Sequence, residues 1–393
     1  MTPSTDGSLA LDKPGGPLGP VWREAAERTQ RDVLAQGATV VTCSAPLGAG
    51  GLGRHLSEIL DAVERGGRPP QNVSGWSPPL SRALGRLRIP VSPGMRTRLF
   101  MGEFDVHAAR LLPQSEHLIA FNGQALKQFA AARRKGYDSL ALVSANSHLR
   151  QVARRHELAH RRYPLEGSWT RFMLERNLAE YARADRIYVA SHYVRESFLA
   201  EGVAEELLFD FPLTPAPRFQ PEGRHAGVGE GAGSGSASEA DSGVAPDAAS
   251  GRFEVVYVGS LAVHKGVPLL IDAIRRLPHA DLRLTLVGGW GSRGMRRFVQ
   301  SACAADPRLE VRAGDPLPYL RRARLCVHPA YEDGFAYAPA EALACGVPVI
   351  VSEDTGMKEL IGSAAMGLTV PTDDLDALSQ AIDAAYRREL LDR

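Results

Sequence analysis

Short β-branched segments alternate with amphipathic helical segments along most of the chain, and this order constrains the fold more than any other feature. ATVVTCSAP, which begins at Ala38, predicts a buried strand. The glycine-rich turn LGAGGLGRHL follows it, and apolar residues then recur at helical spacing at Leu52, Leu56, Ile59, Leu60 and Val63. The same succession recurs in HLIAFNG with QALKQFAAARRKG and in RIYVAS with HYVRESFLAEG. Such alternation predicts parallel sheets with helices on both faces, the doubly wound α/β class.

One long segment interrupts this pattern. Residues 221–251 are rich in Gly, Ala and Ser and nearly free of large apolar side chains, so the segment buries too little surface to fold by itself. The pattern restarts at FEVVYVGS, and 393 residues are too many for one ordinary core. We therefore predict a partly disordered N-terminal extension with one helix, a Rossmann-like domain, a flexible linker or loop, and a second Rossmann-like domain, over residues 1–37, 38–219, 220–252 and 253–393.

Composition excludes several classes of protein. The formal net charge is +1, which gives no overall attraction to nucleic acid or to anionic lipid. The four cysteines lie far apart, without the spacing of a metal site or of a disulfide framework, and indicate a reducing compartment: Cys43, Cys303, Cys326 and Cys345. The chain starts without the basic and apolar regions of a signal peptide, and it has no apolar run long enough to span a bilayer. We expect a cytoplasmic protein that binds no nucleic acid.

Three segments carry residues suited to an anionic ligand that is rich in hydroxyl groups. The glycines of LGAGGLGRHL allow close backbone approach just before a helix N-terminus, which favours an anion. VGSLAVHKG places Lys265 between a strand and a helix, where it suits a phosphate. EDGFAYAPAE places Asp333 in a loop at the C-terminal end of a strand and Glu341 in the next helix, where carboxylates accept hydrogen bonds from hydroxyls. Each segment alone also has an ordinary interpretation: a tight turn, a solvated lysine, or surface and capping acids.

Taken together, the order and spacing of these segments resemble the family 4 glycosyltransferases, which are retaining enzymes of the GT-B fold. EALACGVPVI, TGMKELI and GLTVPTDDLDALSQAI are also similar to that family. The resemblance is close over residues 253–388 and loose over residues 38–219. It implies two Rossmann-like domains that face a central cleft, and transfer of a hexose from a UDP- or GDP-sugar to an acceptor. The resemblance also implies that the reaction needs no metal and no other cofactor.

The resemblance assigns roles to individual residues. Lys265 would neutralise the leaving diphosphate, Glu341 would hold the ribose hydroxyls, and Asp333 would contact the donor sugar. His148 follows a strand where relatives often place a cleft histidine, and an ordinary capping or surface role is equally open. The remaining donor-binding residues would be Gly50, Gly51, Ser260, Gly334, Phe335 and Ala336. Asp374 and Asp376 form an Asp-x-Asp sequence, but they lie at a predicted helix start and are interpreted as a cap.

The sequence also departs from the family pattern. Asp333 stands where a longer Glu is usual, and Ala336 stands where the loop usually has a second Gly. Ser260 stands where an Arg is usual, which leaves Lys265 with His264 or Arg54 to compensate. The chain stops at YRRELLDR, where relatives usually carry a further helix, and we expect the helix near residues 21–36 as a replacement. A catalytically weak or inactive donor-binding scaffold is therefore the alternative function. A sugar-nucleotide epimerase or a phosphorylase is disfavoured by the EDGF segment.

The acceptor is not identified by the sequence, and a glycan, a lipid-linked molecule and a small molecule all stay open. Residues 74–100 are apolar and basic, so contact with an acceptor or with a membrane surface is conceivable. A solvated loop packed on the sheet is the interpretation that we favour for this segment, and peripheral membrane contact has no other support.

Overall fold

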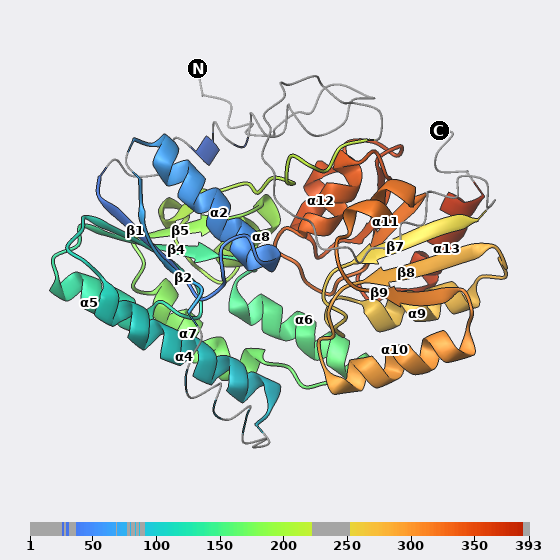
Figure 1. Cartoon of the computed structure of the whole chain (residues 1–393), viewed down its shortest axis with the longest axis horizontal. Coiled ribbons are helices and arrows are strands. Elements are labelled where there is room, and N and C mark those ends of the chain that lie inside the picture. Colours follow the sequence, from blue (N-terminus) through green and yellow to red (C-terminus); the bar gives the residue numbers. More distant parts are fainter. Residues whose placement is uncertain are drawn as a thin grey trace, which may run out of the picture.

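The computed structural model describes residues 37–67, 69–76, 91–221 and 252–387, together with Ala26, Thr29, Gln30, Pro79, Ala83 and Arg86. It contains two six-stranded parallel sheets that lie side by side, one in each half of the chain (Figure 1). The doubly wound α/β prediction is therefore confirmed. Most of the helix expected near residues 21–36 and nearly all of the expected linker lie outside the described residues, so these features and the domain boundaries stay predictions.

The first sheet forms the N-terminal domain, and its strand order is β2-β1-β3-β4-β5-β6. Helix α2 (Gly50–Arg65) packs on one face, and α5 (Leu126–Arg134) and α8 (His192–Leu199) pack on the other. Helices α4 (Pro93–Leu111) and α7 (Thr170–Tyr181) lie beside α5 (Figure 1). The strands are β1 (Thr39–Cys43), β2 (Gln71–Ser74), β3 (His117–Phe121), β4 (Ser139–Ser144), β5 (Arg186–Val189) and β6 (Leu208–Asp210).

The second sheet forms the C-terminal domain, with the order β12-β11-β10-β7-β8-β9. The chain runs outward from β7 to β9 and then returns to β10 on the other side of β7. Open parallel sheets bind ligands at such a switch point, beyond the C-terminal ends of the two central strands. The strands are β7 (Phe253–Val258), β8 (Leu282–Val287), β9 (Leu309–Arg312), β10 (Leu325–His328), β11 (Val349–Ser352) and β12 (Gly367–Val370).

Helices cover both faces of this second sheet, and this explains its continuous apolar runs. In β10, Leu325 and Val327 join one buried cluster, while Cys326 between them joins another on the opposite face. Successive side chains of a strand point to opposite faces, so a strand that is buried on both sides is apolar throughout. One face packs on α9 (Val267–Arg276), α10 (Arg293–Ala305) and α13 (Leu375–Tyr386), and the other on α11 (Leu317–Arg322) and α12 (Tyr337–Ala344).

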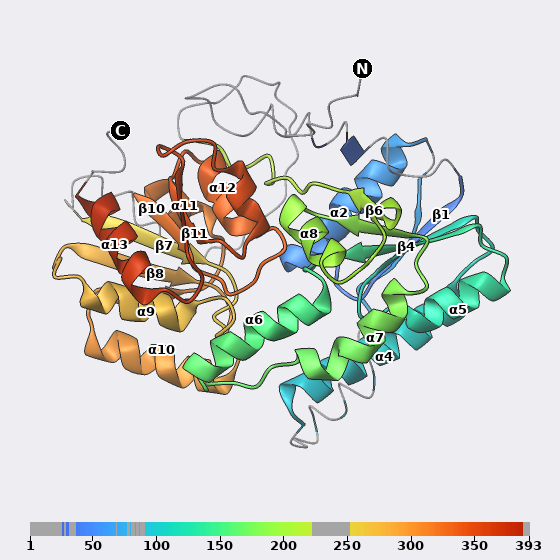
Figure 2. The ribbon, with the colours of Figure 1, turned by 180° about the vertical axis from the view of Figure 1, so that it is seen from behind.

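Helix α6 (Leu149–Arg162) belongs to the first domain and lies between the two sheets in both views (Figures 1 and 2). Ala159 of this helix packs in the buried cluster of the second domain. Just beyond the helix, the Tyr163 hydroxyl donates to Asp272 over 2.7 Å, and the Glu166 carboxylate accepts from the Val263 N–H over 2.7 Å. These bonds fix the second domain against the first, beside the turn that carries Lys265.

One prediction about the N-terminal domain was wrong. Residues 74–100 were expected to form a solvated loop packed on the sheet, but the last part of this segment forms helix α4, which begins at Pro93. Most of residues 77–90 lie outside the described residues, so the prediction stays untested there. Ser92 caps this helix, because its hydroxyl accepts from the Met95 N–H over 3.3 Å, and Pro93 occupies the first turn, which tolerates proline.

The Asp374 prediction is confirmed, since its carboxylate accepts from the Ala377 N–H and caps α13. None of the helices that the structure describes is both long and apolar enough to cross a bilayer.

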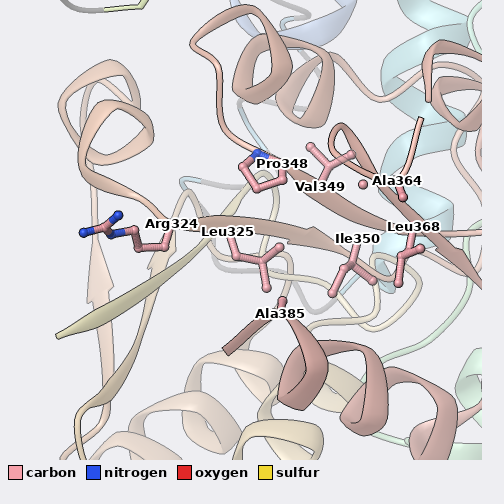
Figure 3. A pocket seen from close by; sticks show the side chains of 9 residues that line it. Arg324, Leu325, Pro348, Val349, Ile350, Ala364, Leu368 and Ala385 are labelled. Carbon is pink, nitrogen blue, oxygen red and sulfur yellow. The ribbon is translucent and has the colours of Figure 1, made fainter. Parts of the chain in front are cut away.

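A small cavity lies at the edge of the second sheet where β10 to β12 begin, opposite the switch point (Figure 3). It is lined mainly by apolar side chains, among them Leu325, Ile350, Leu368 and Ala385, and its volume is about 10 Å³. That is close to the smallest volume that holds one water molecule. A ligand site at this edge is therefore not supported.

Gly266 makes the close approach of the two central loops possible, and this can be tested. Its φ is +72°, and a Cβ there would lie 1.9 Å from the Pro329 carbonyl oxygen after β10. We expect Gly266→Ala to cost about 1 kcal/mol for the left-handed backbone and about 2 kcal/mol more for the clash. Gly136→Ala is the matched control, because Gly136 has a φ of +78° and open space around it. Thermal unfolding should show a clearly larger loss for Gly266→Ala, and equal losses would contradict the clash.

Candidate functional site

The switch point of the second sheet holds a three-membered polar cluster of Lys265, Asp333 and His328. The Lys265 ammonium lies 2.8 Å from Asp333 Oδ2 and also donates to the Glu332 carbonyl over 3.3 Å. His328 Nε2 lies 3.0 Å from the same Asp333 oxygen. Burial opposes the charge on Lys265, but the carboxylates of Asp333 and Glu332 outweigh it and raise the pKa of the lysine. The lysine is therefore a fixed cation at the place where such sheets bind ligands.

Asp333 is fully engaged by groups of its own domain. Its second oxygen, Oδ1, accepts from the Ala336 N–H over 3.0 Å. Burial alone would raise the pKa of Asp333, but Lys265 and His328 hold it far below its usual range. Its backbone joins the loop after β10 to the loop after β11, because its N–H donates to the Asp354 carbonyl and its carbonyl accepts from Gly356. The predicted contact of Asp333 with a donor sugar stays a prediction.

Ala336 occupies the position where a glycine was expected, and it keeps a backbone conformation typical of glycine. Its φ is +64°, and it is the N-cap residue of α12. A left-handed alanine costs about 1 kcal/mol. The loop therefore keeps the glycine-like backbone at this cost and does not adopt a different conformation. The neighbouring Gly334 is close-packed, since a Cβ there would lie 3.0 Å from the Ala145 carbonyl. The Gly334 carbonyl accepts from Ser191 of the first domain over 2.7 Å.

Two helix N-termini meet next to this cluster, one from each domain. No side chain among the described residues caps α2 or α12, and neither helix has an acid in its first turn. Gly50 has a φ of +62° at the start of α2, and a Cβ on Gly51 would lie 3.8 Å from the Tyr337 ring at the start of α12. The free N–H groups and the helix dipoles at these two N-termini favour an anion. The predicted glycine turn and the loop of Phe335 and Ala336 are therefore brought together.

Glu341 lies in α12 with only 1% of its surface exposed, and its partner comes from the other domain. The Arg54 guanidinium forms an ion pair with Glu341 Oε1 and lies 4.2 Å from the centre of the Tyr337 ring. The Tyr337 hydroxyl in turn donates to Glu58 of α2 over 2.7 Å. The carboxylate expected to hold a ribose is thus occupied by an arginine of the first domain in this structure.

Two further residues of the predicted set, His148 and Ser260, lie in surroundings that differ from those expected. The His148 ring is buried between Tyr181 and Phe198, at centroid distances of 4.9 and 5.1 Å, and its Nδ1 accepts from the Arg150 N–H at the start of α6. Burial lowers the pKa of His148 to about 4, so the ring is neutral at pH 7. This geometry favours the capping role, and the structure does not bring the ring to Lys265. Ser260 is exposed just after β7, with its carbonyl bound to the Tyr257 hydroxyl.

The sequence did not single out Glu332, which the structure places at the domain interface. Its side chain is 2% exposed, and Oε1 accepts from the Ser147 N–H of the first domain over 3.1 Å. Burial raises the pKa of this carboxyl group despite the nearby lysine. The sequence did offer one signal for Glu332, which is its position next to Asp333. Neighbouring side chains in a loop point in different directions, so the two acids were not expected to share one site. Glu58 was missed for another reason, since an isolated acid on a helix carries no signature of its partner.

A cavity of about 230 Å³ lies between α2 and the segment after β6, and Arg54, Glu58 and Tyr337 line part of it. Pockets for cofactors and other small molecules usually measure about 300–1,000 Å³. This cavity is therefore too small for a nucleotide sugar, and neither Lys265 nor Asp333 lines it.

Comparison with solved structures defines the class of fold. Sucrose-phosphate synthase from Thermosynechococcus elongatus matches with a TM-score of 0.64 and 18% identity, over 90% of each chain. HepE of Anabaena in complex with UDP-glucose matches with a TM-score of 0.63 and 15% identity, over 90% of this chain and 91% of that one. At such identities the likeness shows the fold alone. The protein has the GT-B fold, as the sequence resemblance predicted.

Comparison of sequences then defines the family. Residues 252–388 match the family model described as Glycosyl transferases group 1. A D-inositol 3-phosphate glycosyltransferase of Paenarthrobacter aurescens is 29% identical over 165 residues, 38% of this chain and 40% of that protein. The O-antigen chain mannosyltransferase B of Escherichia coli is 31% identical over 135 residues, 32% of this chain and 35% of that protein. The C-terminal domain belongs to the glycosyl transferases group 1 family, and the matches span well under two thirds of these relatives.

The left-handed backbone at Ala336 gives a prediction for stability. Ala336→Gly should stabilise the protein by about 1 kcal/mol or less, because glycine adopts this φ without strain, and the amide that faces Asp333 is kept. Ala338→Gly, in the first turn of the same helix, should destabilise it, because glycine is unfavourable in helices. Chemical denaturation of both variants measures the free energy of unfolding, which should rise in Ala336→Gly and fall in Ala338→Gly. A loss of stability in Ala336→Gly would show that the methyl group itself contributes packing.

Glu58 gives a prediction for pH dependence. Burial raises the pKa of Glu58 from 4.5 to about 7, although the bonds from Tyr337 and Thr214 act in the opposite direction. Between these two values the folded protein binds more protons than the unfolded chain, so this residue's contribution to stability falls as pH rises. Glu58→Gln should therefore flatten the loss of stability between pH 5 and pH 7, measured by thermal unfolding. Glu64→Gln, an exposed acid on the same helix, is the control, and parallel curves for the wild type and Glu58→Gln would refute the assignment.

Proposed function

We propose that the protein is a retaining glycosyltransferase that transfers a hexose from a nucleoside diphosphate sugar to an acceptor held by the N-terminal domain. One observation carries the proposal: the uncapped N-termini of α2 and α12 meet across the domain interface, beside the fixed cation Lys265 at the switch point. Such an arrangement is built for an anion larger than a single phosphate. The family of the C-terminal domain and the fold of the UDP-glucose complex of HepE both support this donor class.

The chemistry of this site is electrostatic. The bond between the anomeric carbon and the diphosphate breaks, and its electron pair leaves with the diphosphate oxygen. Lys265 and the N–H groups of the two helix termini stabilise the charge that develops there, which is worth most in the transition state. The acceptor oxygen bonds to the same face of the sugar, and its proton passes to the departing phosphate oxygen. No metal and no protein nucleophile takes part in this scheme.

Glu341 and Asp333 have separate tasks in the proposal. Glu341 lies in the second turn of α12, beside the first helix turn that faces the diphosphate, so its carboxylate receives the ribose hydroxyls. Asp333 keeps Lys265 in place and, at 19% side-chain exposure, offers an edge to the donor sugar. The identity of the hexose, the base and the acceptor is left to experiment.

A donor-binding scaffold is the second candidate function, and a specific observation favours it. Both acids expected at the donor are paired with cations of the protein itself, Asp333 with Lys265 and Glu341 with Arg54. A protein that binds a nucleotide sugar without turning it over would show the same pairs.

The test is turnover of UDP- and GDP-sugars, one at a time, followed by release of the nucleoside diphosphate. Lys265→Ala and Glu341→Ala should each lower turnover at least about 100-fold, because each removes a charged contact to the donor. Lys358→Ala is the matched control, since the Lys358 ammonium donates to the Glu353 carbonyl and not to Asp333. Unchanged activity in both site variants would refute the assignment, and binding measured by calorimetry without any turnover would favour the scaffold.

A further inference from the structure

We infer that Arg54 is the second cation of the diphosphate site and the gate of the ribose site. In this structure it is held on Glu341, and the ribose hydroxyls of the donor release it toward the phosphates. This inference rests on the proposed function and adds a residue to the donor site. Its basis is the arrangement of Arg54, Glu341 and Tyr337 across the domain interface.

The charge balance at the switch point calls for another cation. Lys265 lies against Asp333, so the charges of these two groups cancel each other locally. Ser260 stands where the family resemblance predicts an arginine. His264 does not fill the gap, because burial lowers its pKa well below the usual value and keeps the ring neutral. A nucleoside diphosphate that gains charge as it leaves therefore needs a positive group from elsewhere.

Arg54 is placed to supply that charge. It lies one helix turn after Gly50 in α2, on the helix whose uncapped N-terminus meets the start of α12. Its side chain is 29% exposed, and the Tyr337 ring supports the guanidinium face at 4.2 Å. A guanidinium binds phosphate in two-pronged geometry, and an aromatic ring holds its plane without fixing its contacts. The side chain can therefore exchange one anionic partner for another without leaving the ring.

The same arrangement makes Arg54 a gate. Glu341 has 2% side-chain exposure, and Arg54 is the cation on its Oε1 atom. Ribose hydroxyls that bind this carboxylate must take the place of the guanidinium. The exchange links recognition of the nucleoside to delivery of positive charge at the diphosphate, so neither half of the donor is bound to full strength without the other.

The experiment compares a nucleoside with its diphosphate on the full chain. Calorimetry with UDP, GDP and ADP first identifies the base that the wild type binds, and the corresponding nucleoside is then the second probe. Arg54→Ala should weaken binding of the nucleoside diphosphate by about 10- to 100-fold, the worth of one charge-assisted bond. The same variant should bind the nucleoside more tightly than the wild type, because Glu341 is no longer paired. A merely structural role of Arg54 would weaken both ligands together.

Two further variants keep the test independent of folding. Ser260→Arg, at an exposed position, should tighten binding of the diphosphate and leave the nucleoside unchanged. Combined with Arg54→Ala, it should restore the affinity for the diphosphate. Arg65→Ala is the matched control, because Arg65 lies on the same helix and binds Gln30 instead.

The outcomes separate the two levels of the proposal. If the wild type binds none of the three diphosphates, the proposed function fails and this inference fails with it. If the wild type binds one of them and Arg54→Ala changes neither ligand, or weakens both equally, the inference is overturned while the proposed function stands. Opposite shifts for the nucleoside and the diphosphate, with recovery in the double variant, support it.

Discussion

The Asp333 carboxylate holds together the part of the molecule on which the site depends. One oxygen pairs with Lys265 from the loop after β7 and with His328 at the end of β10, and the other accepts from the Ala336 N–H just before α12. Its backbone adds bonds to the loop after β11. Three loops of one sheet edge are thus fixed by one residue, in surroundings where an unpaired charge would be costly. Breaking this group would leave a partly buried lysine without its counterion as well as loosening the loops.

The two domains meet through carboxylates that occupy helix N-termini of the opposite domain. Glu332 accepts from the Ser147 N–H just before α6, and Glu359 accepts from the His192 and Tyr193 N–H groups at the start of α8. Helix starts are where backbone N–H groups lack partners, so an acid from the other domain satisfies them and also meets the helix dipole favourably. The same physical preference that would draw a diphosphate into the site therefore also holds the domains together, and a ligand must compete with contacts of the same kind.

The elements that the sequence predicted well are those whose burial imposes a periodicity. β10 and β11 are buried on both faces and appear as apolar runs, and α9 repeats large apolar residues three and four positions apart at Val267, Leu270, Ile271 and Ile274. The short edge strands β2, β6 and β12 were not predicted, because three or four residues with partial exposure leave no clear period. Helix α4 was missed for a related reason, since only a few of its residues are buried and its Ser-Pro start resembles a turn.

The residues of the candidate site also fall into those that the sequence indicates and those that it does not. Lys265, Asp333 and the glycine turn were singled out from the sequence because their placement depends on local strand-turn-helix order, and their roles stay predictions. The pairing of Arg54 with Glu341 joins residues 287 positions apart, and nothing local in either segment specifies it. The left-handed φ of Ala336 was also hidden, because alanine normally indicates a right-handed backbone. Its conformation is imposed by Asp333, which binds its N–H, and by the packing of Gly334 against the first domain. A loop held at both ends in this way tolerates an alanine where the family pattern has a glycine. The presence of Ala336 by itself therefore does not indicate that the site is inactive.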